Sequence, residues 1–251
     1  MTDTACNDAA IGALRAKVSE LEALNERLAQ FAYAAAHDLE EPLRKIRQYG
    51  DLLVEDHSAT LNKDGQFYVN VMTSSAQRLS SLVKNLLQFA SASQGDLVLK
   101  PVDLEKPFQK ALDDVQHPLE EVGMVTKMGS LPTVQCDEML VQIVFNNLVL
   151  NAIKYRAPGR SPEMTIALAE DGDDLVLSFT DNGIGFDKSE ADRIFEPFVR
   201  LGSKSEAQGT GIGLAICRTI CERHNWSLTA SGIKDSHARF EIRIPGANRN
   251  D

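Results

Sequence analysis

A stretch in the second half of the chain carries three polar residues at helical spacing. Asn147, Asn151 and Lys154 stand at i, i+4 and i+7, so they share an arc of about 60° on an α-helix. Most other residues of the stretch 137–155 are apolar, which predicts a buried helix with one polar strip. Amide oxygens suit Mg²⁺, and an ammonium group suits phosphate. The strip therefore predicts either a ligand site or a set of hydrogen bonds within the core.

Two glycine-rich motifs follow. DNGIG at 181–185 places the Asp181 carboxylate after a predicted strand, where it can accept a hydrogen bond from an exocyclic amine such as adenine N6. GTGIGLAI at 209–216 opens a helix, whose free N–H groups favour phosphate. Each motif alone is also compatible with ordinary turn chemistry. The segment between them combines a few aromatic residues with a Gly/Ser/Lys stretch, which favours either a mobile lid that docks through its aromatics or a surface loop.

A histidine on a helix far upstream is a candidate nucleophile. His37 lies two residues from both Ala35 and Leu39, about 200° around the helix from each, so it points away from the apolar seam. A largely neutral imidazole can act as a nucleophile, although a single exposed histidine is also an ordinary solvated side chain. Pro42 removes a helical hydrogen bond about one turn further on, which predicts a bent or loosened helix there.

Two long helices must position this histidine. Apolar residues recur in steps of three and four over residues 11–56 and again over 66–92, with a loop at 57–65 between them. One helical hairpin has too narrow a core to stand alone, so we expect two copies to pair into a dimeric four-helix bundle. Residues 1–30 are expected to form an N-terminal coiled-coil arm, and residues 31–94 the hairpin.

The remainder of the chain mixes helices and strands. After a linker at 95–103, helices are predicted near 104–121, 137–155 and 211–224, and strands at 163–169, 174–180, 226–231 and 237–244. These elements show no regular βαβ alternation. We therefore expect an α+β fold, in which residues 104–251 form an α/β sandwich with its helices on one face of the sheet.

Composition limits the classes of function. The 251 residues are 43% hydrophobic and carry 26 basic against 36 acidic residues, a net charge of −10 that disfavours binding to nucleic acid. The four cysteines follow no disulfide or zinc pattern. The first residues lack the features of a signal peptide, and amides interrupt the longest apolar run. We therefore expect a cytoplasmic protein without a membrane span.

Taken in order, the motifs resemble those of two-component sensor histidine kinases over roughly residues 31–245. FAYAAAHDLEEPLRKI resembles the H box, NNLVLNAIKY the N box, DNGIG the G1 box, IFEPFVRL the F box and GTGIGLAI the G2 box. The opening HDLEEPLRKI is most similar to the phytochrome-like branch of these kinases. The resemblance implies a HisKA-type dimerisation and phosphotransfer hairpin followed by a Bergerat-type ATP-binding domain.

The resemblance also implies a role for each matching residue. His37 would accept a phosphoryl group from ATP, Asp38 would polarise its imidazole, and Asn151 would bind Mg²⁺. The phosphoryl group would then pass to an aspartate on a response-regulator receiver domain. The implied nucleotide-binding residues are Asn147, Asn151, Lys154, Tyr155, Asp181, Gly183, Gly185, Phe195, Phe198, Gly209, Thr210, Gly211, Gly213 and Leu214.

Two other functions compete with this one. ATP-hydrolysing relatives resemble one another in placing a glutamate, as general base, four residues before the metal-binding asparagine. Here that position is Asn147, an amide that cannot take a proton, which favours transfer to His37 over hydrolysis. A non-catalytic scaffold or phosphotransfer module with a decayed ATP domain would lack Asn151, Asp181 or the G2 glycines, and all of these are present.

Two further expectations concern regulation. Many family members carry Thr or Asn four residues after the histidine, where it orients water for dephosphorylating the regulator. This chain has Glu41, whose carboxylate would repel a phosphoaspartate, so we expect weak phosphatase activity. Only 36 residues precede His37, fewer than a folded sensor needs. The signal is therefore expected from a separate protein or from a sensor domain missing from this sequence.

Overall fold

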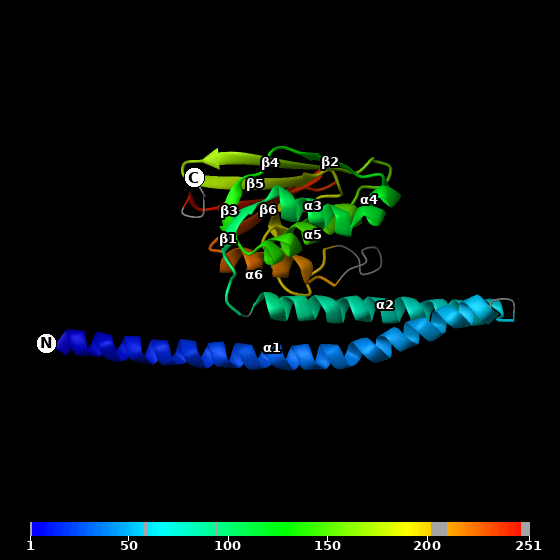
Figure 1. Cartoon of the computed structure of the whole chain (residues 1–251), viewed down its shortest axis with the longest axis horizontal. Coiled ribbons are helices and arrows are strands. Elements are labelled where there is room, and N and C mark those ends of the chain that lie inside the picture. The colour runs from blue at the N-terminus through cyan, green and yellow to red at the C-terminus, as the bar shows by residue number, and fades with distance from the viewer. Residues whose placement is uncertain (1, 58–59, 94, 202–209, 247–251) are drawn as a thin grey trace. The chain divides into compact units, whose positions relative to one another are not determined.

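The computed structural model describes residues 2–57, 60–93, 95–201 and 210–246; the side chains of His37 and of most residues before 34 lie outside this description. The chain forms two compact units, Met1–Gln94 and Gly95–Asp251. The first is helical and the second combines helices with sheets (Figure 1). The predicted α+β fold class is confirmed.

The first unit is a helical hairpin of α1 (Thr2–His57) and α2 (Lys63–Ala92). Helix α2 begins three residues before the predicted start because the Asn62 side chain caps it, accepting a hydrogen bond from the Gly65 N–H at 2.8 Å. Small residues let the helices approach closely: a Cβ at Gly50 would clash with the Thr73 side chain. The buried cluster between the helices comprises Ala36, Leu43, Ala76 and Val83, with Leu87 packed against it.

Helix α1 remains continuous through Pro42, and Figure 1 shows that it curves toward α2 before the hairpin loop. A proline inside a helix is a common cause of curvature. Within this single chain, several large apolar side chains of the hairpin are exposed. They are Leu39, Ile46, Tyr49, Leu52, Leu53, Phe67, Tyr68, Val71, Met72 and Leu79.

A five-stranded sheet organises the second unit, with strand order β2-β4-β5-β7-β6, in which β2 is Val125–Met128. Strands β4 (Glu163–Asp171) and β5 (Asp174–Asp181) form one hairpin, and β6 (Ser227–Ile233) and β7 (His237–Ile244) form another. β5 pairs antiparallel with β7, and this register sets Asp181 opposite Ala238. Strand β5 therefore ends at the aspartate of the DNGIG motif.

Helices α3 (Glu105–Asp114), α5 (Glu138–Lys154) and α6 (Gly213–Arg223) lie on one face of this sheet, as predicted (Figure 1). An aromatic cluster joins two of them to it: the Phe108, Phe145 and Phe179 rings lie with centroids 5.5–6.2 Å apart. All three rings are fully buried. Truncating one of them to alanine would cost about 3–5 kcal/mol, so this cluster fixes α5 on the sheet.

Three short strands were not predicted: β1 (Lys100–Asp103), β2 (Val125–Met128) and β3 (Thr133–Cys136). β1 lies within the segment that we assigned to the linker, and it pairs antiparallel with β3. The single helix predicted at 104–121 is two helices, α3 and α4 (Gln116–Val122). Pro118 explains the break, since its ring clashes with the carbonyl of the residue four positions earlier, Asp114, where α3 ends.

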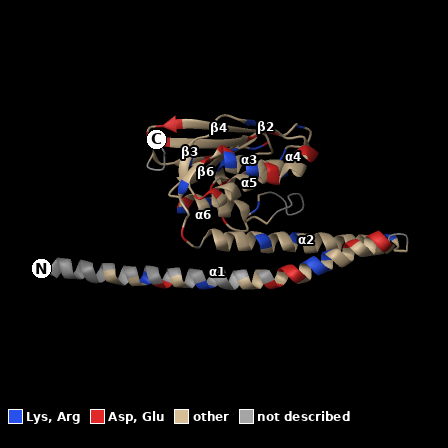
Figure 2. Cartoon of the chain, viewed as in Figure 1, with Lys and Arg blue, Asp and Glu red and all other residues tan. Residues whose placement is uncertain are grey.

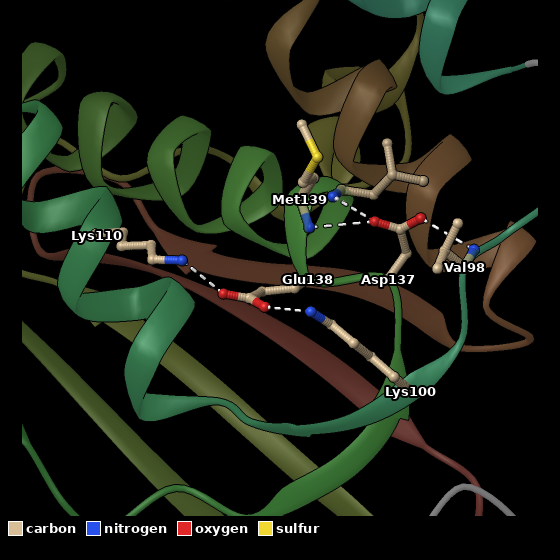
Figure 3. A network of polar contacts seen from close by, with 7 residues as sticks. Val98, Lys100, Lys110, Asp137, Glu138 and Met139 are labelled. Atoms are coloured by element: carbon tan, nitrogen blue, oxygen red, sulfur yellow. Dashed lines mark hydrogen bonds and ion pairs between the residues drawn. The ribbon is translucent and has the colours of Figure 1, made fainter.

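Polar contacts fasten the start of α5 to its neighbours (Figure 3). The Asp137 side chain caps the helix by accepting from the Met139 N–H at 3.1 Å, and its other oxygen accepts from the Val98 N–H at 3.2 Å. Glu138 pairs with Lys100 at 2.7 Å and with Lys110 at 2.6 Å. These ion pairs lower the pKa of Glu138 to about 2.

Charges of both signs are interspersed over the described parts of both units (Figure 2). Within the same residues, no helix has the length and hydropathy needed to cross a membrane.

Candidate functional site

The polar strip of α5 lies as predicted on one side of a largely buried helix. Asn147, Asn151 and Lys154 are each half-buried, whereas Leu148 and Val149 between them are buried. The Lys154 ammonium donates to the Tyr155 hydroxyl at 2.8 Å and lies 4.4 Å from the centre of that ring. The Tyr155 ring therefore holds the lysine at the C-terminal end of the strip.

Asn151 has an unsatisfied polar atom. Its side-chain Nδ2 is buried and has no hydrogen-bond partner among the described residues. Leaving a buried polar group unpaired costs about 1–3 kcal/mol, so this amide is a natural place for a ligand or for water. Among those residues no cluster of His, Cys, Asp and Glu could hold a metal ion. The amide oxygens of the strip have the chemistry that Mg²⁺ prefers in its ligands.

Asp181 is a buried carboxylate, 6% exposed, at the end of β5. Its Oδ1 accepts a hydrogen bond from the Gly183 N–H at 2.9 Å. Burial raises the pKa of Asp181 above its usual range, although hydrogen bonds from the Gly183 and Ala238 backbone oppose that shift. A buried carboxylate of this kind gains from a further donor, such as the amine of a ligand.

The glycines of DNGIG are explained by close approach to the protein itself. A Cβ at Gly183 would clash with the Tyr155 carbonyl oxygen, which also accepts from the Ile184 N–H at 2.9 Å. Gly185 has φ 57°, and a Cβ there would clash with the Ile233 carbonyl. These two glycines let the loop pack closely against the end of α5 and against β6.

The GTGIGLAI motif brings the start of α6 against the polar strip. Gly213 is the first residue of α6, and a Cβ there would lie 2.5 Å from the Asn147 Oδ1. Gly211 has φ 74°, and its carbonyl accepts from the Phe198 N–H at 2.9 Å. Thr210 Oγ1 accepts from the backbone N–H two residues on at 3.3 Å, and Leu214 is half-buried in the first turn. Gly209 lies outside the described residues.

The two aromatic residues predicted to dock a lid differ in environment. Phe195 is 3% exposed, stacks under the Arg218 guanidinium at 4.0 Å and contacts the Phe240 ring of β7. Phe198 is 64% exposed and has φ 66°, an uncommon backbone conformation for a bulky residue. Phe195 is therefore part of the packed unit, whereas Phe198 marks the exposed side of the segment leading to Gly211.

The predicted nucleotide-binding residues that the structure describes thus lie in one unit, around α5, the end of β5 and the start of α6. His37 and Asp38 lie in the other unit, on α1. Sequence reasoning missed Arg160, which donates hydrogen bonds to backbone carbonyls around the DNGIG loop. Because the partners of Arg160 are backbone carbonyls, the pattern of side chains in the sequence does not indicate its role.

Comparisons with known proteins agree with this division. Residues 136–248 match the family model of histidine kinase-, DNA gyrase B- and HSP90-like ATPases, and residues 27–95 match that of the His Kinase A (phospho-acceptor) domain. The chain is 34% identical over 228 residues to the phytochrome-like protein Cph1 of Synechocystis sp., covering 91% of this chain and 30% of Cph1. It therefore spans less than a third of that relative's length.

Two solved structures are similar to this chain in fold. Full-length ShkA in complex with AMPPNP superposes with a TM-score of 0.64 and 26% identity, covering 86% of this chain and 45% of ShkA. The histidine kinase ThkA, in complex with the response regulator TrrA, shares the fold with a TM-score of 0.59 at 19% identity, covering 86% of this chain and 61% of ThkA. The chain belongs to the two-component sensor histidine kinases.

Proposed function

We propose that this chain is an ATP-dependent protein histidine kinase that phosphorylates itself on His37. In this proposal residues 31–94 form the dimerisation and phosphotransfer hairpin, and residues 104–251 form the catalytic ATP-binding domain. The observation that carries it is the close approach of Gly213 to Asn147. That approach places the free N–H groups of a helix N-terminus, which favour phosphate, beside a strip of amides and an ammonium that suit Mg²⁺ and phosphate.

Each end of the nucleotide has its own set of residues. The adenine amine would donate to the Asp181 carboxylate. Asn151 would bind Mg²⁺, and Asn147 and Lys154 would help to hold the metal–phosphate group. When bound, Mg²⁺ would neutralise part of the triphosphate charge. The Lys154 contact with the Tyr155 hydroxyl holds the ammonium at the C-terminal end of the polar strip. These groups align the γ-phosphate with the incoming nucleophile.

Transfer forms a bond between an imidazole nitrogen of His37 and the γ-phosphorus, as the bond from that phosphorus to the ADP oxygen breaks. Asp38, the next residue, stabilises the positive charge that develops on the ring. Hydrolysis would need a general base near the metal, and the Asn147 amide cannot accept a proton. Phosphohistidine then donates its phosphoryl group to an aspartate of a response-regulator receiver domain. The shared fold with ThkA, solved with a response regulator, supports this partner.

A second copy of the chain is the proposed partner of the hairpin. Tyr49, Phe67, Tyr68 and Met72 are each at least 60% exposed in the single chain, and Leu39 and Ile46 of the predicted seam are also uncovered. An apolar surface of this extent on a narrow hairpin is expected to be buried in a four-helix bundle. We place the protein in the cytoplasm, where ATP and receiver domains meet.

Incubation with Mg·ATP labelled in the γ-phosphate tests the proposal. We expect label on the protein that is lost in acid and retained in base, as phosphohistidine requires. The ATPase alternative instead predicts continuous release of inorganic phosphate without protein label. The scaffold alternative predicts neither labelling nor nucleotide binding. Substituting Asn151→Ala should abolish labelling in the kinase, because the metal–phosphate group loses its ligand.

A further inference from the structure

Arg160 joins two segments that are far apart in the sequence. From the loop after α5, its Nη1 donates to the Asn182 carbonyl at 2.8 Å and to the Ser236 carbonyl at 2.8 Å. Its Nη2 donates to the Asp235 carbonyl at 3.1 Å. A guanidinium presents several donors in a rigid plane, so one side chain can fix the relative position of three carbonyls. Arg160 thereby ties the DNGIG loop to the turn between β6 and β7.

The protein itself satisfies every polar group of Asn182, the second residue of DNGIG. Its Oδ1 accepts from the Glu163 N–H at 2.9 Å, and its Nδ2 donates to the Ser161 carbonyl at 2.9 Å. Its backbone N–H donates to the Glu163 carbonyl at 3.1 Å, and its carbonyl is the Arg160 acceptor. Asn182 therefore anchors the loop and leaves ligand contact to its neighbour, Asp181.

The turn between β6 and β7 holds the same loop from the other side. Asp235 has φ 61° and donates its N–H to the Ile184 carbonyl at 2.6 Å. Arg160 binds the carbonyl of this same residue. The turn therefore holds the loop between Asp181 and Gly185 in two ways. One is the direct hydrogen bond from Asp235 to Ile184, and the other is the bridge that Arg160 makes between Asn182 and the turn.

We propose that Arg160 is a positioning residue for adenine recognition: by clamping Asn182 to the Asp235–Ser236 turn, it fixes the direction of the Asp181 carboxylate. The proposal rests on the proposed binding of ATP at this site. Asp181 directly precedes the clamped residue, and its Oδ1 is bound to the Gly183 N–H directly after it. A shift of the loop would therefore turn the carboxylate away from the adenine amine. The phosphate-binding residues, on α5 and α6, would keep their places.

The test compares Mg·ATP with Mg·ITP, whose base lacks the exocyclic amine, by calorimetry on the full chain. We expect Arg160→Met to weaken ATP binding by roughly tenfold, about the effect of one or two hydrogen bonds, and to change ITP binding little. Arg160→Lys should recover part of the preference for ATP, because an ammonium can reach some of the carbonyls. Hydrogen exchange at the backbone amides of residues 182–185 should quicken in Arg160→Met.

Arg243→Met is the matched control. That half-buried arginine pairs with Asp171 at 2.6 Å and with Asp174 at 3.0 Å, at the opposite end of β5 from Asp181. Its removal should leave the ATP-to-ITP ratio unchanged. If Arg160→Met weakens both nucleotides equally, or neither, the positioning role is wrong while ATP binding stands. If the unsubstituted chain binds no ATP, the proposed function itself fails.

Discussion

Replacing Asp181 by asparagine tests most directly whether this carboxylate recognises the adenine amine of ATP. The Asp181 Oδ1 accepts a hydrogen bond from the Gly183 N–H at 2.9 Å, and the carboxylate also accepts one from the Ala238 N–H. Asparagine has one oxygen to offer these donors, so its NH2 group must face either the backbone or the ligand amine. In either case the adenine amine loses a charged acceptor.

The expected loss of ATP affinity can be estimated from the burial of Asp181. Because Asp181 is 6% exposed, water cannot replace the lost partner, and a hydrogen bond to a charged group contributes about 1.5–3 kcal/mol. At about 1.4 kcal/mol per factor of ten, Asp181→Asn should weaken Mg·ATP binding by roughly 10- to 150-fold. Binding of Mg·ITP should weaken less, because its base carbonyl can accept from the new NH2 group. Titration calorimetry with both nucleotides measures the two effects.

Asp181→Asn should change the stability of the nucleotide-free protein only slightly. Burial raises the pKa of Asp181, which means that the native state holds the proton more tightly than the unfolded chain does. Stability is therefore lost as pH rises through the native pKa, and asparagine removes that cost. We expect the melting temperature at neutral pH to change by less than about 4 °C. ATP binding within threefold of the unsubstituted chain would refute adenine recognition by Asp181.

Three further outcomes are expected. Regulator dephosphorylation should be slow and should quicken in Glu41→Asn; brisk activity in the unsubstituted chain would contradict the repulsion argument. Gly213→Ala should weaken nucleotide binding, because its Cβ would lie 2.5 Å from a side-chain oxygen of the polar strip, whereas Gly129→Ala, with nothing within 4 Å, should not. Burial lowers the pKa of His224, so its contribution to the free energy of unfolding should be lost as pH falls below about 6.5, and His224→Gln should reduce that pH dependence.

Long periodic elements were predictable because each turn repeats the same signal. The hairpin, α5 and the strand pairs of the main sheet were all located from spacing. Most of their ends are displaced by no more than three residues, but α1 begins at Thr2, nine residues before the predicted start at residue 11. The strands β1, β2 and β3 were missed because each is four residues long, too short for an alternating pattern to emerge. The break between α3 and α4 was readable in principle from Pro118, by the same steric argument that we applied to Pro42.

The site was predictable where side chains themselves carry the chemistry. Asn151 stood out because a polar residue on an apolar helix needs a partner, and Asp181 because its carboxylate follows a predicted strand at the start of DNGIG. In the structure the Asn151 Nδ2 is buried without a hydrogen-bond partner among the described residues, and Asp181 is buried. Arg160 was not predictable, since it acts on backbone carbonyls 22 to 76 residues away. The reason for the DNGIG glycines was equally hidden, because their neighbours are the carbonyls of Tyr155 and Ile233.

The central claim is that the γ-phosphoryl group of ATP reaches His37. The most direct measurement compares the unsubstituted chain with His37→Gln after incubation with Mg·ATP, following protein-bound phosphate and nucleotide binding in parallel. We expect the variant to bind ATP with unchanged affinity and to carry no acid-labile, base-stable phosphate. Normal labelling of His37→Gln would show that the phosphoryl acceptor lies elsewhere.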